Sequence, residues 1–281
     1  MKIKCCVFSI LALLGLSLCV NLFWFYAPQK FSIQHFQPHF AHEAAWDVPS
    51  ANLSQIQAIL KQRFTYLGHG KQAMVFASAD HAYVLKLFYY QRPVRKHWWK
   101  RPENWLRYSS PSWIYKIALR HAKLKKLFHS THLAFSEMRA ESGLVFVHLN
   151  TTQVLSENVT LLDRHGHTHC VDLNATPFVL QHKAELLPAH LKRLIRAGDF
   201  ASAQQTLEKL RSFFAWRTQQ GISDACQQFK NNYGILQGEI VQLDTGKILK
   251  YPELDPLEER RKIHQRLEHW VKKYFPELIA D

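Results

Sequence analysis

The stretch that decides the fold is GISDACQQFKNNYGILQGEIVQLDTG, residues 221–246. Within it, two short apolar runs at 233–236 and 240–243 are separated by a Gln-Gly turn, which predicts a β-hairpin. Residues with oxygen-bearing side chains border these runs: Asp224, Asn232 and Asp244. Each of them suits a turn or a helix cap, because Asp and Asn side chains bond to nearby backbone groups. The alternative is that together they hold a metal ion beside a phosphate group.

Composition places the chain among globular proteins with an anionic partner. Of its 281 residues, 47% are hydrophobic and 21% are charged, which excludes a disordered chain. This length accommodates one large domain or two smaller lobes. The formal charge is +14, and twelve of the 36 Lys and Arg residues lie between Lys86 and Lys126 beside a single acid. Such a charge indicates a phospholipid, nucleic-acid or nucleotide partner without choosing among them.

The N-terminus predicts a membrane anchor. Residues 5–26 carry no charge, and a transmembrane helix needs roughly 20 apolar residues. We therefore expect a single-pass anchor at 1–27, with a cleaved signal peptide or a lipid-modified form as the alternative. Lys2 and Lys4 favour a cytoplasmic N-terminus, which would place the folded part outside the cytoplasm.

A basic segment rich in aromatic residues, 92–115, resists any periodic assignment. It interleaves six Lys and Arg residues with four tryptophans. Bases and tryptophans together are typical of contact with an anionic membrane surface, which is the role we expect. A structural insert packed on the small lobe is the alternative, and contact with nucleic acid is less favoured.

The remaining patterns predict an α+β protein with two lobes. Residues 28–51 contain three prolines and no clear period, so they form a linker or a segment lying along the surface. Apolar residues at helical spacing follow from Asn52, and a β-hairpin with a polar turn covers 73–89. Further along, the patterns predict one helix at 116–141, strands at 143–149, 158–163 and 169–181, and helices at 189–198, 199–219 and 256–274. The first part of the chain is thus predicted to contain strands and one long helix. The second part is predicted to contain helices and one short β element, which together indicate an α+β protein with two lobes.

Two smaller features leave alternatives open. Cys170 and Cys226 either form a disulfide in an oxidising compartment or remain free thiols. His165, His167 and His169 have the residue type of metal ligands, yet they surround a glycine in a tight turn. We favour a solvated turn over a metal site for this segment.

A glycine-rich turn and a strand lysine point to phosphate binding. Gly68 and Gly70 open a turn in which backbone N–H groups can approach a phosphate, and Lys86 lies within an apolar strand. Burying a lysine charge without a partner is costly, although an edge strand would let the side chain reach the solvent. A glycine-rich hairpin followed by a strand lysine resembles the arrangement that covers the phosphates of ATP in kinases. In that arrangement the lysine pairs with a helix carboxylate, for which Glu137 and Glu141 are candidates on one helix face, Glu137 being preferred.

In the order of its polar residues, the chain from about 64 to 250 resembles the protein-kinase-like superfamily. Within that family it is more similar to divergent kinases with a small C-lobe, or to pseudokinases, than to ordinary protein kinases. The resemblance implies a bilobal fold behind the N-terminal anchor. The β-rich N-lobe would cover 52–182, including the basic aromatic segment, and the helical C-lobe 183–281. It also implies ATP and Mg²⁺ as cofactors.

The resemblance implies a role for each polar residue in turn. Asp224 stands where the catalytic base orients the acceptor hydroxyl, and Asn232 and Asp244 stand where Mg²⁺ is held. Lys86 stands where the α- and β-phosphates are bound. Gln181 ends the strand that matches the hinge between the lobes, where backbone groups would receive the adenine.

The chain departs from the family pattern around the same residues. Ile222 and Ser223 replace the usual His and Arg, and the step of eight residues from Asp224 to Asn232 is longer than the family's H-R-D-L-x-x-x-N pattern allows. After Asp244 only 37 residues remain, without an A-P-E-like segment. Two hypotheses follow. One is a membrane-anchored phosphotransferase that acts on an unidentified hydroxyl; the other is an inactive pseudokinase scaffold that binds a protein or an anionic membrane through its basic face.

Overall fold

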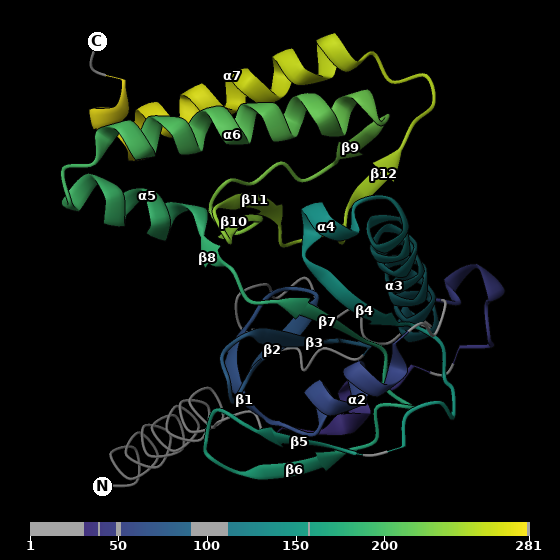
Figure 1. The fold of residues 1–281 in the computed structure, drawn as a ribbon. Helices are drawn as coiled ribbons and strands as arrows, with labels where there is room; N and C mark the ends of the chain where they lie inside the picture. Colours follow the sequence, from purple (N-terminus) through teal and green to yellow (C-terminus); the bar gives the residue numbers. More distant parts are fainter. Residues whose placement is uncertain (1–30, 39, 49–51, 91–111, 157, 280–281) are drawn as a thin grey trace, which may run out of the picture.

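The computed structural model (Figure 1) describes five stretches of the chain: 31–38, 40–48, 52–90, 112–156 and 158–279. The predicted anchor at 1–27 and most of the predicted basic aromatic segment lie outside these residues. Within the described part of the chain, no helix is both long and apolar enough to cross a membrane. Helices and β-sheets are both present, so the predicted α+β class is confirmed.

A seven-stranded sheet forms one end of the molecule (Figure 1). Its strands are β1 (Arg63–His69), β2 (Ala73–Ser78), β3 (Tyr83–Phe88), β4 (Leu144–His148), β5 (Val159–Leu162), β6 (Thr168–Val171) and β7 (Phe178–His182). Their order across the sheet is β4-β7-β3-β2-β1-β5-β6; β1 and β5 are parallel and the other neighbours antiparallel. β2 and β3 form the predicted hairpin. Because β3 lies between β2 and β7, Lys86 stands in a central strand and not at an edge.

Helix α2 (Leu53–Leu60) packs on this sheet. Its buried face consists of Ile56, Ile59 and Leu60, at the spacing that puts side chains on one side of a helix. The segment before it forms two short 3-10 helices, η1 (Ile33–His35) and η2 (Ala44–Trp46), and buries Phe36 and Trp46. Of the two predicted alternatives for this segment, the structure therefore favours a segment lying along the surface of the fold.

A long helix, α3 (Ser112–Glu137), is followed at once by a short one, α4 (Arg139–Ser142). The single helix predicted at 116–141 is interrupted at Met138, whose backbone leaves the helical region with φ −138° and ψ 34°. Met138 is fully buried, and the same core buries Leu124, Leu127 and Phe128 of α3. The break turns the chain so that α4 leads directly into β4.

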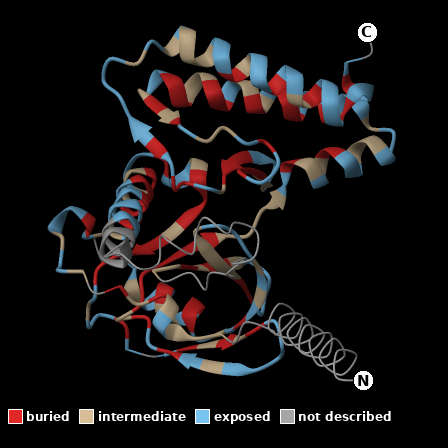
Figure 2. Cartoon of the chain, turned by 180° about the vertical axis from the view of Figure 1, so that it is seen from behind, coloured by how far each residue is buried: buried red, intermediate tan, exposed pale blue. Residues whose placement is uncertain are grey.

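Helices fill the other end of the molecule (Figures 1 and 2). They are α5 (Leu187–Arg196), α6 (Phe200–Gln219), α7 (Pro256–Tyr274) and the 3-10 helix η6 (Pro276–Leu278). α6 and α7 lie side by side, and each buries one face (Figure 2). The predicted stop at Gly198, which has φ 73°, and the predicted cap at Asp199, which accepts a hydrogen bond from the Ser202 N–H, are both confirmed.

Two small sheets lie between the seven-stranded sheet and α6 (Figure 1). One consists of β8 (Glu185–Leu186), β10 (Tyr233–Leu236) and β11 (Glu239–Gln242), and the other of β9 (Ile222–Asp224) and β12 (Ile248–Lys250). β10 and β11 form the hairpin predicted from the 221–246 stretch. The chain enters this region from β7 through β8, so β7 is the link between the sheet end and the helical end.

Candidate functional site

The side chain of Lys86 connects the seven-stranded sheet to the segment that precedes Asp244. Lys86 lies in the middle of β3, opposite Val75 of β2 and Val179 of β7. Its Nζ donates a hydrogen bond of 2.7 Å to the backbone carbonyl of Leu243. This contact brings together two parts of the chain that are 157 residues apart.

Gln181 supports the same contact from the neighbouring strand. Its side chain is fully buried, and its Nε2 donates to the Leu243 carbonyl at 3.5 Å and to the Ser142 carbonyl at 2.5 Å. The Oε1 of Gln181 is buried without a hydrogen-bond partner. The residue predicted at the hinge therefore directs its side chain inward, toward the carbonyl that binds Lys86.

Burial and a nearby acid act in opposite directions on the Lys86 ammonium. Burial lowers the pKa of Lys86 from 10.5 to about 8, and the carboxylate of Asp244 partly opposes this shift. Part of the Lys86 side chain still reaches the surface. Asp244 is thus close enough to Lys86 to favour its charged form.

Asp244 lies in a tight turn that is packed from two directions. Its Oδ1 accepts a hydrogen bond of 3.0 Å from the Gly246 N–H, and the residue is exposed. A Cβ added to Gly246 would lie 2.5 Å from Cδ1 of Leu127 on α3 and 2.7 Å from Oε1 of Gln72 in the β1–β2 turn. Only glycine fits here without a shift of these side chains, so the predicted Asp-x-Gly motif lies where α3 and the β1–β2 turn meet.

Asp224 lies at the end of β9, where its backbone pairs with Ile248 of β12. The residue is only 4% exposed, and its carboxylate accepts hydrogen bonds from the Cys226 N–H at 2.8 Å and from Nε2 of Gln242 at 3.0 Å. Burial raises the pKa of Asp224, and the carboxylate of Asp244 adds to the increase. The two predicted acids therefore interact.

Asn232 fixes the loop between the two acids. Its Nδ2 donates to the Cys226 carbonyl at 3.0 Å, and its backbone carbonyl accepts from the Leu243 N–H at 2.7 Å. A hydrogen bond from Asn232 also lowers the pKa of Asp224. The structure therefore brings Asn232, Asp224, Asp244 and Lys86 into one polar cluster.

Arg217 is a member of this cluster that sequence reasoning missed. It is completely buried on α6 and donates to the Tyr233 hydroxyl at 3.0 Å, to Oε1 of Gln242 at 2.9 Å and to Oε1 of Gln227 at 2.8 Å. Gln242 in turn donates to Asp224, so Arg217 positions that carboxylate through Gln242. The signal in the sequence was a base at helical spacing from the apolar residues Leu210 and Phe214.

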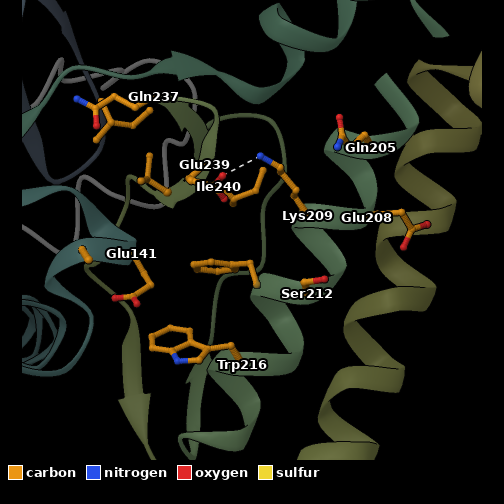
Figure 3. A pocket seen from close by; sticks show the side chains of 13 residues that line it. Glu141, Gln205, Glu208, Lys209, Ser212, Trp216, Gln237, Glu239 and Ile240 are labelled. Carbon is orange, nitrogen blue, oxygen red and sulfur yellow. Dashed lines mark hydrogen bonds and ion pairs between the residues drawn. The ribbon is translucent and has the colours of Figure 1, made fainter. Parts of the chain in front are cut away.

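The predicted partner of Lys86 is wrong. Glu137 forms an ion pair with Lys250 of β12, and among the described residues neither Glu137 nor Glu141 contacts Lys86. Glu141 lines a separate cavity of about 680 Å³ beside α6 and the β10–β11 hairpin (Figure 3), together with Trp216. The physical reason is the break at Met138, which places the two glutamates on different helices.

Gly68 and Gly70 lie in and beside β1, next to an irregularity in its pairing with β2. Neither has a positive φ, and a Cβ added to either would meet no atom within 4 Å. Packing within the chain therefore does not require these glycines. The open space above them is compatible with the close approach of a ligand to the backbone.

The oxygen atoms around Asp244 fit a hard cation bound together with phosphate. Among the described residues, Oδ2 of Asp244 and Oδ1 of Asn232 accept no hydrogen bond from another side chain or backbone group. Carboxylate and amide oxygens are suitable ligands for Mg²⁺. No group of three or more His, Cys, Asp and Glu side chains in the described ranges could hold a metal ion by itself. Oxygen atoms of a bound phosphate group and of water would complete the ligand set of such an ion.

The histidine segment is organised by one carboxylate. Asp163 accepts hydrogen bonds from the backbone N–H groups of His165 and His167, and its Oδ2 lies 2.9 Å from Nε2 of His169. Residues 164–166 form the predicted turn. Cys170 and Cys226 are both free thiols.

No protein-family model and no curated protein matches the chain in sequence. Among solved structures, the chain is similar to the bifunctional kinase-methyltransferase WbdD. A medium-resolution structure of WbdD matches with a TM-score of 0.40 and 15% identity, over 72% of this chain and 34% of WbdD. A co-crystal structure with the kinase inhibitor LY294002 matches with a TM-score of 0.40 and 14% identity, over 75% and 38%. The chain thus spans about a third of the length of these structures, and a likeness at this TM-score does not establish a shared fold or activity.

Proposed function

We propose that the chain is a kinase-like phosphotransferase that transfers the γ-phosphate of ATP to a hydroxyl group. The observation that supports this proposal is the cluster of Lys86, Asp224, Asn232 and Asp244, which come from distant parts of the sequence. In the proposed bilobal arrangement, the sheet end (52–182) is the N-lobe and the helical end (183–281) is the C-lobe. The cluster lies where these two parts meet.

The residues of the cluster suit the separate tasks of phosphoryl transfer. Lys86 has ammonium protons beyond the one that it donates to Leu243, and these can bind phosphate oxygens. Asp244 and Asn232 would hold Mg²⁺, which neutralises charge on the phosphates when bound. Gly68 and Gly70 would let the β1–β2 turn approach the same phosphates.

Asp224 is suited to take up the proton of the acceptor. In the reaction, the acceptor oxygen bonds to the γ-phosphorus while the bond from that phosphorus to the β–γ bridging oxygen breaks. The products are ADP, the phosphorylated acceptor and one proton. Burial raises the pKa of Asp224, which makes its carboxylate a better proton acceptor. The bonds from Cys226 and Gln242 occupy one lone pair on each carboxylate oxygen, so the acceptor hydroxyl would bond to a remaining lone pair or displace one of these donors.

A pseudokinase scaffold is the second candidate, and two observations favour it. Neither predicted glutamate pairs with Lys86, because Glu137 binds Lys250 instead. Both oxygens of Asp224 are also occupied by hydrogen bonds. Such a scaffold would bind a protein or an anionic membrane surface through its basic face. Anchoring through residues 1–27 stays a prediction under either hypothesis.

Binding of Mg-ATP to the full-length protein distinguishes the two candidates. We expect the melting temperature to rise by about 5 °C at an ATP concentration a hundred times the dissociation constant. In Asp244→Asn this increase should be lost, while the melting temperature without ligand stays the same, because the amide oxygen can still accept the Gly246 hydrogen bond. A wild-type protein that is not stabilised by Mg-ATP would contradict the enzyme hypothesis and leave the scaffold.

A further inference from the structure

A cavity of about 950 Å³ opens beside the turn that follows Asp244. Its walls come from the middle of α3, the β1–β2 turn and the chain just after Asp244. Ala225 and Gly246 line the cavity. Ala225 directly follows Asp224, and the Gly246 N–H is bound to Asp244. A ligand in this cavity therefore lies beside the backbone that follows Asp224 and Asp244, whose own side chains are not part of the lining.

The cavity is lined by an excess of positive charge. Its cationic residues without an acidic partner in the described structure are Lys71, Arg120, Lys123, Lys126 and Lys247. All five side chains are exposed. The acid in the lining is Glu43, and it is already paired with Lys125 at 3.1 Å. These five charges are therefore not neutralised within the described chain.

The position of these charges follows from the periodicity of α3. Arg120, Lys123 and Lys126 recur every three residues, next to the buried residues Leu124 and Leu127. Like charges at this spacing repel one another and destabilise a helix. The arrangement is favourable when an anion lies among them, since several cations lining a concave surface concentrate counter-charge there. The size of the cavity is within the range of small-molecule sites and exceeds what a single phosphate ion would fill.

From this geometry we propose that the cavity binds a phosphate-bearing polyol, such as a sugar phosphate or a phosphorylated lipid headgroup. Its phosphate would bind to the cations of α3, Lys71 and Lys247. Its hydroxyl groups would then face Ala225 and Gly246. One of those hydroxyls is the acceptor of the γ-phosphate, and this part of the inference rests on the proposed function. The binding of the anion does not depend on that function.

The test uses the full-length protein and fructose 1,6-bisphosphate as the soluble probe, with fructose as the uncharged control. We expect saturable binding of the bisphosphate by calorimetry and none of fructose. The double variant Arg120→Ala/Lys123→Ala should weaken binding at least tenfold. The matched variant Lys192→Ala/Arg196→Ala, which removes the same two charges from the exposed surface of α5, should bind like wild type. Equal weakening in both double variants would overturn the proposal, as would a wild-type protein that binds neither the bisphosphate nor the phosphorylated lipid tested below.

A second pair of measurements identifies the source of the phosphate and separates this proposal from the phosphotransferase. Phosphatidylcholine vesicles with and without phosphatidylinositol 4-phosphate are tested on the same variants. Binding that requires the phosphoinositide and is lost only in Arg120→Ala/Lys123→Ala assigns a lipid headgroup. If Asp244→Asn still binds the bisphosphate, the cavity proposal is supported. If Mg-ATP in addition fails to stabilise the wild-type protein, the phosphotransferase proposal is contradicted while the cavity proposal stands. Stabilisation by Mg-ATP without bisphosphate or vesicle binding contradicts the cavity proposal alone.

Discussion

Two basic side chains interact with the acids of the cluster, Arg217 with Asp224 and Lys86 with Asp244, and they are held in different ways. Arg217 reaches the Asp224 side from α6; it is completely buried, donates to three side chains and lies over the rings of Phe213 and Phe214. Lys86 reaches the Asp244 side from β3; it remains partly exposed and donates to one backbone carbonyl.

The difference indicates different tasks for the two residues. The hydrogen bonds of Arg217 are made within the chain, so its charge is used to fix Gln242, Gln227 and Tyr233 around Asp224. Burial also raises the pKa of Tyr233 to about 12, so the phenol stays neutral as a hydrogen-bonding partner. Lys86 has donors left over for a ligand. Arg217 therefore holds the side chains around Asp224 in place, whereas Lys86 is available to bind a ligand.

The largest effect is expected for Arg217→Met. The substitution removes the donor to Oε1 of Gln242 and to Oε1 of Gln227, and it leaves the Tyr233 hydroxyl with the hydrogen bond from Gln227 alone. It also removes the charge that lowers the pKa of Asp224. We expect a loss of about 3–5 kcal/mol in the free energy of unfolding, measured with urea. The control is Arg211→Met on the same helix, where an ion pair with Glu208 near the surface should cost less than about 1 kcal/mol. Similar losses in the two variants would refute the structural role of Arg217.

The effect of Lys86→Met on stability should depend on pH. The pKa of Lys86 is about 8 in the folded protein and 10.5 in the unfolded chain, so between these values the unfolded state binds more protons. Wild-type stability from this residue therefore rises with pH across that window, by at most about 3 kcal/mol, and the variant lacks this rise. Below pH 8 the variant should be at least as stable as wild type. The difference in the free energy of unfolding between Lys86→Met and wild type should then decrease as the pH rises from 8 to 10.5.

The measurement is urea unfolding of both proteins at several pH values from 7 to 11. Lys192→Met on α5 serves as the control for the loss of one exposed charge. A stability difference between Lys86→Met and wild type that stays constant with pH would show that the ammonium of Lys86 is fully solvated. In that case the contrast between Lys86 and Arg217 would be lost.

The smallest effect is expected for Glu137→Gln. Glu137 forms a partly exposed ion pair with Lys250 and does not contact Lys86. We expect a loss of less than about 1 kcal/mol in the free energy of unfolding, and an unchanged increase in melting temperature with Mg-ATP. Glu141→Gln is the matched control, since its side chain faces the separate cavity of Figure 3. A selective loss of ATP stabilisation in Glu137→Gln would restore it as the partner of Lys86.

Local patterns predicted most of the elements because each pattern reports the environment of one segment. The β10–β11 hairpin follows from two apolar runs around a Gln-Gly turn, and α7 has the predicted bounds of 256–274. The convergence of Lys86, Asp224, Asn232 and Asp244 was also expected. That expectation came from their order along the chain, in the resemblance to a family, and not from their periodicity.

The sequence did not predict which side chains are paired across long distances in the chain. The spacing of Glu137 and Glu141 puts them on one face only if the helix is continuous, and Met138 interrupts it. Burial of Arg217 depends on hydrogen-bond acceptors from β10, from β11 and from the loop that joins β9 to β10. The sequence of α6 does not show these acceptors. Periodicity shows which face of an element is buried, whereas long-range partners require the tertiary structure.

The two backbone hydrogen bonds of Leu243 have a consequence for how this site can change over evolution. Its N–H is bound by the Asn232 carbonyl, and its C=O by Lys86. Both contacts are made by main-chain atoms of residue 243, so they place few demands on which amino acid stands there. They depend instead on the number of residues between Asn232 and Asp244. Conservation at this point should therefore appear as a constant length of chain, and a comparison of side-chain identities alone would overlook it.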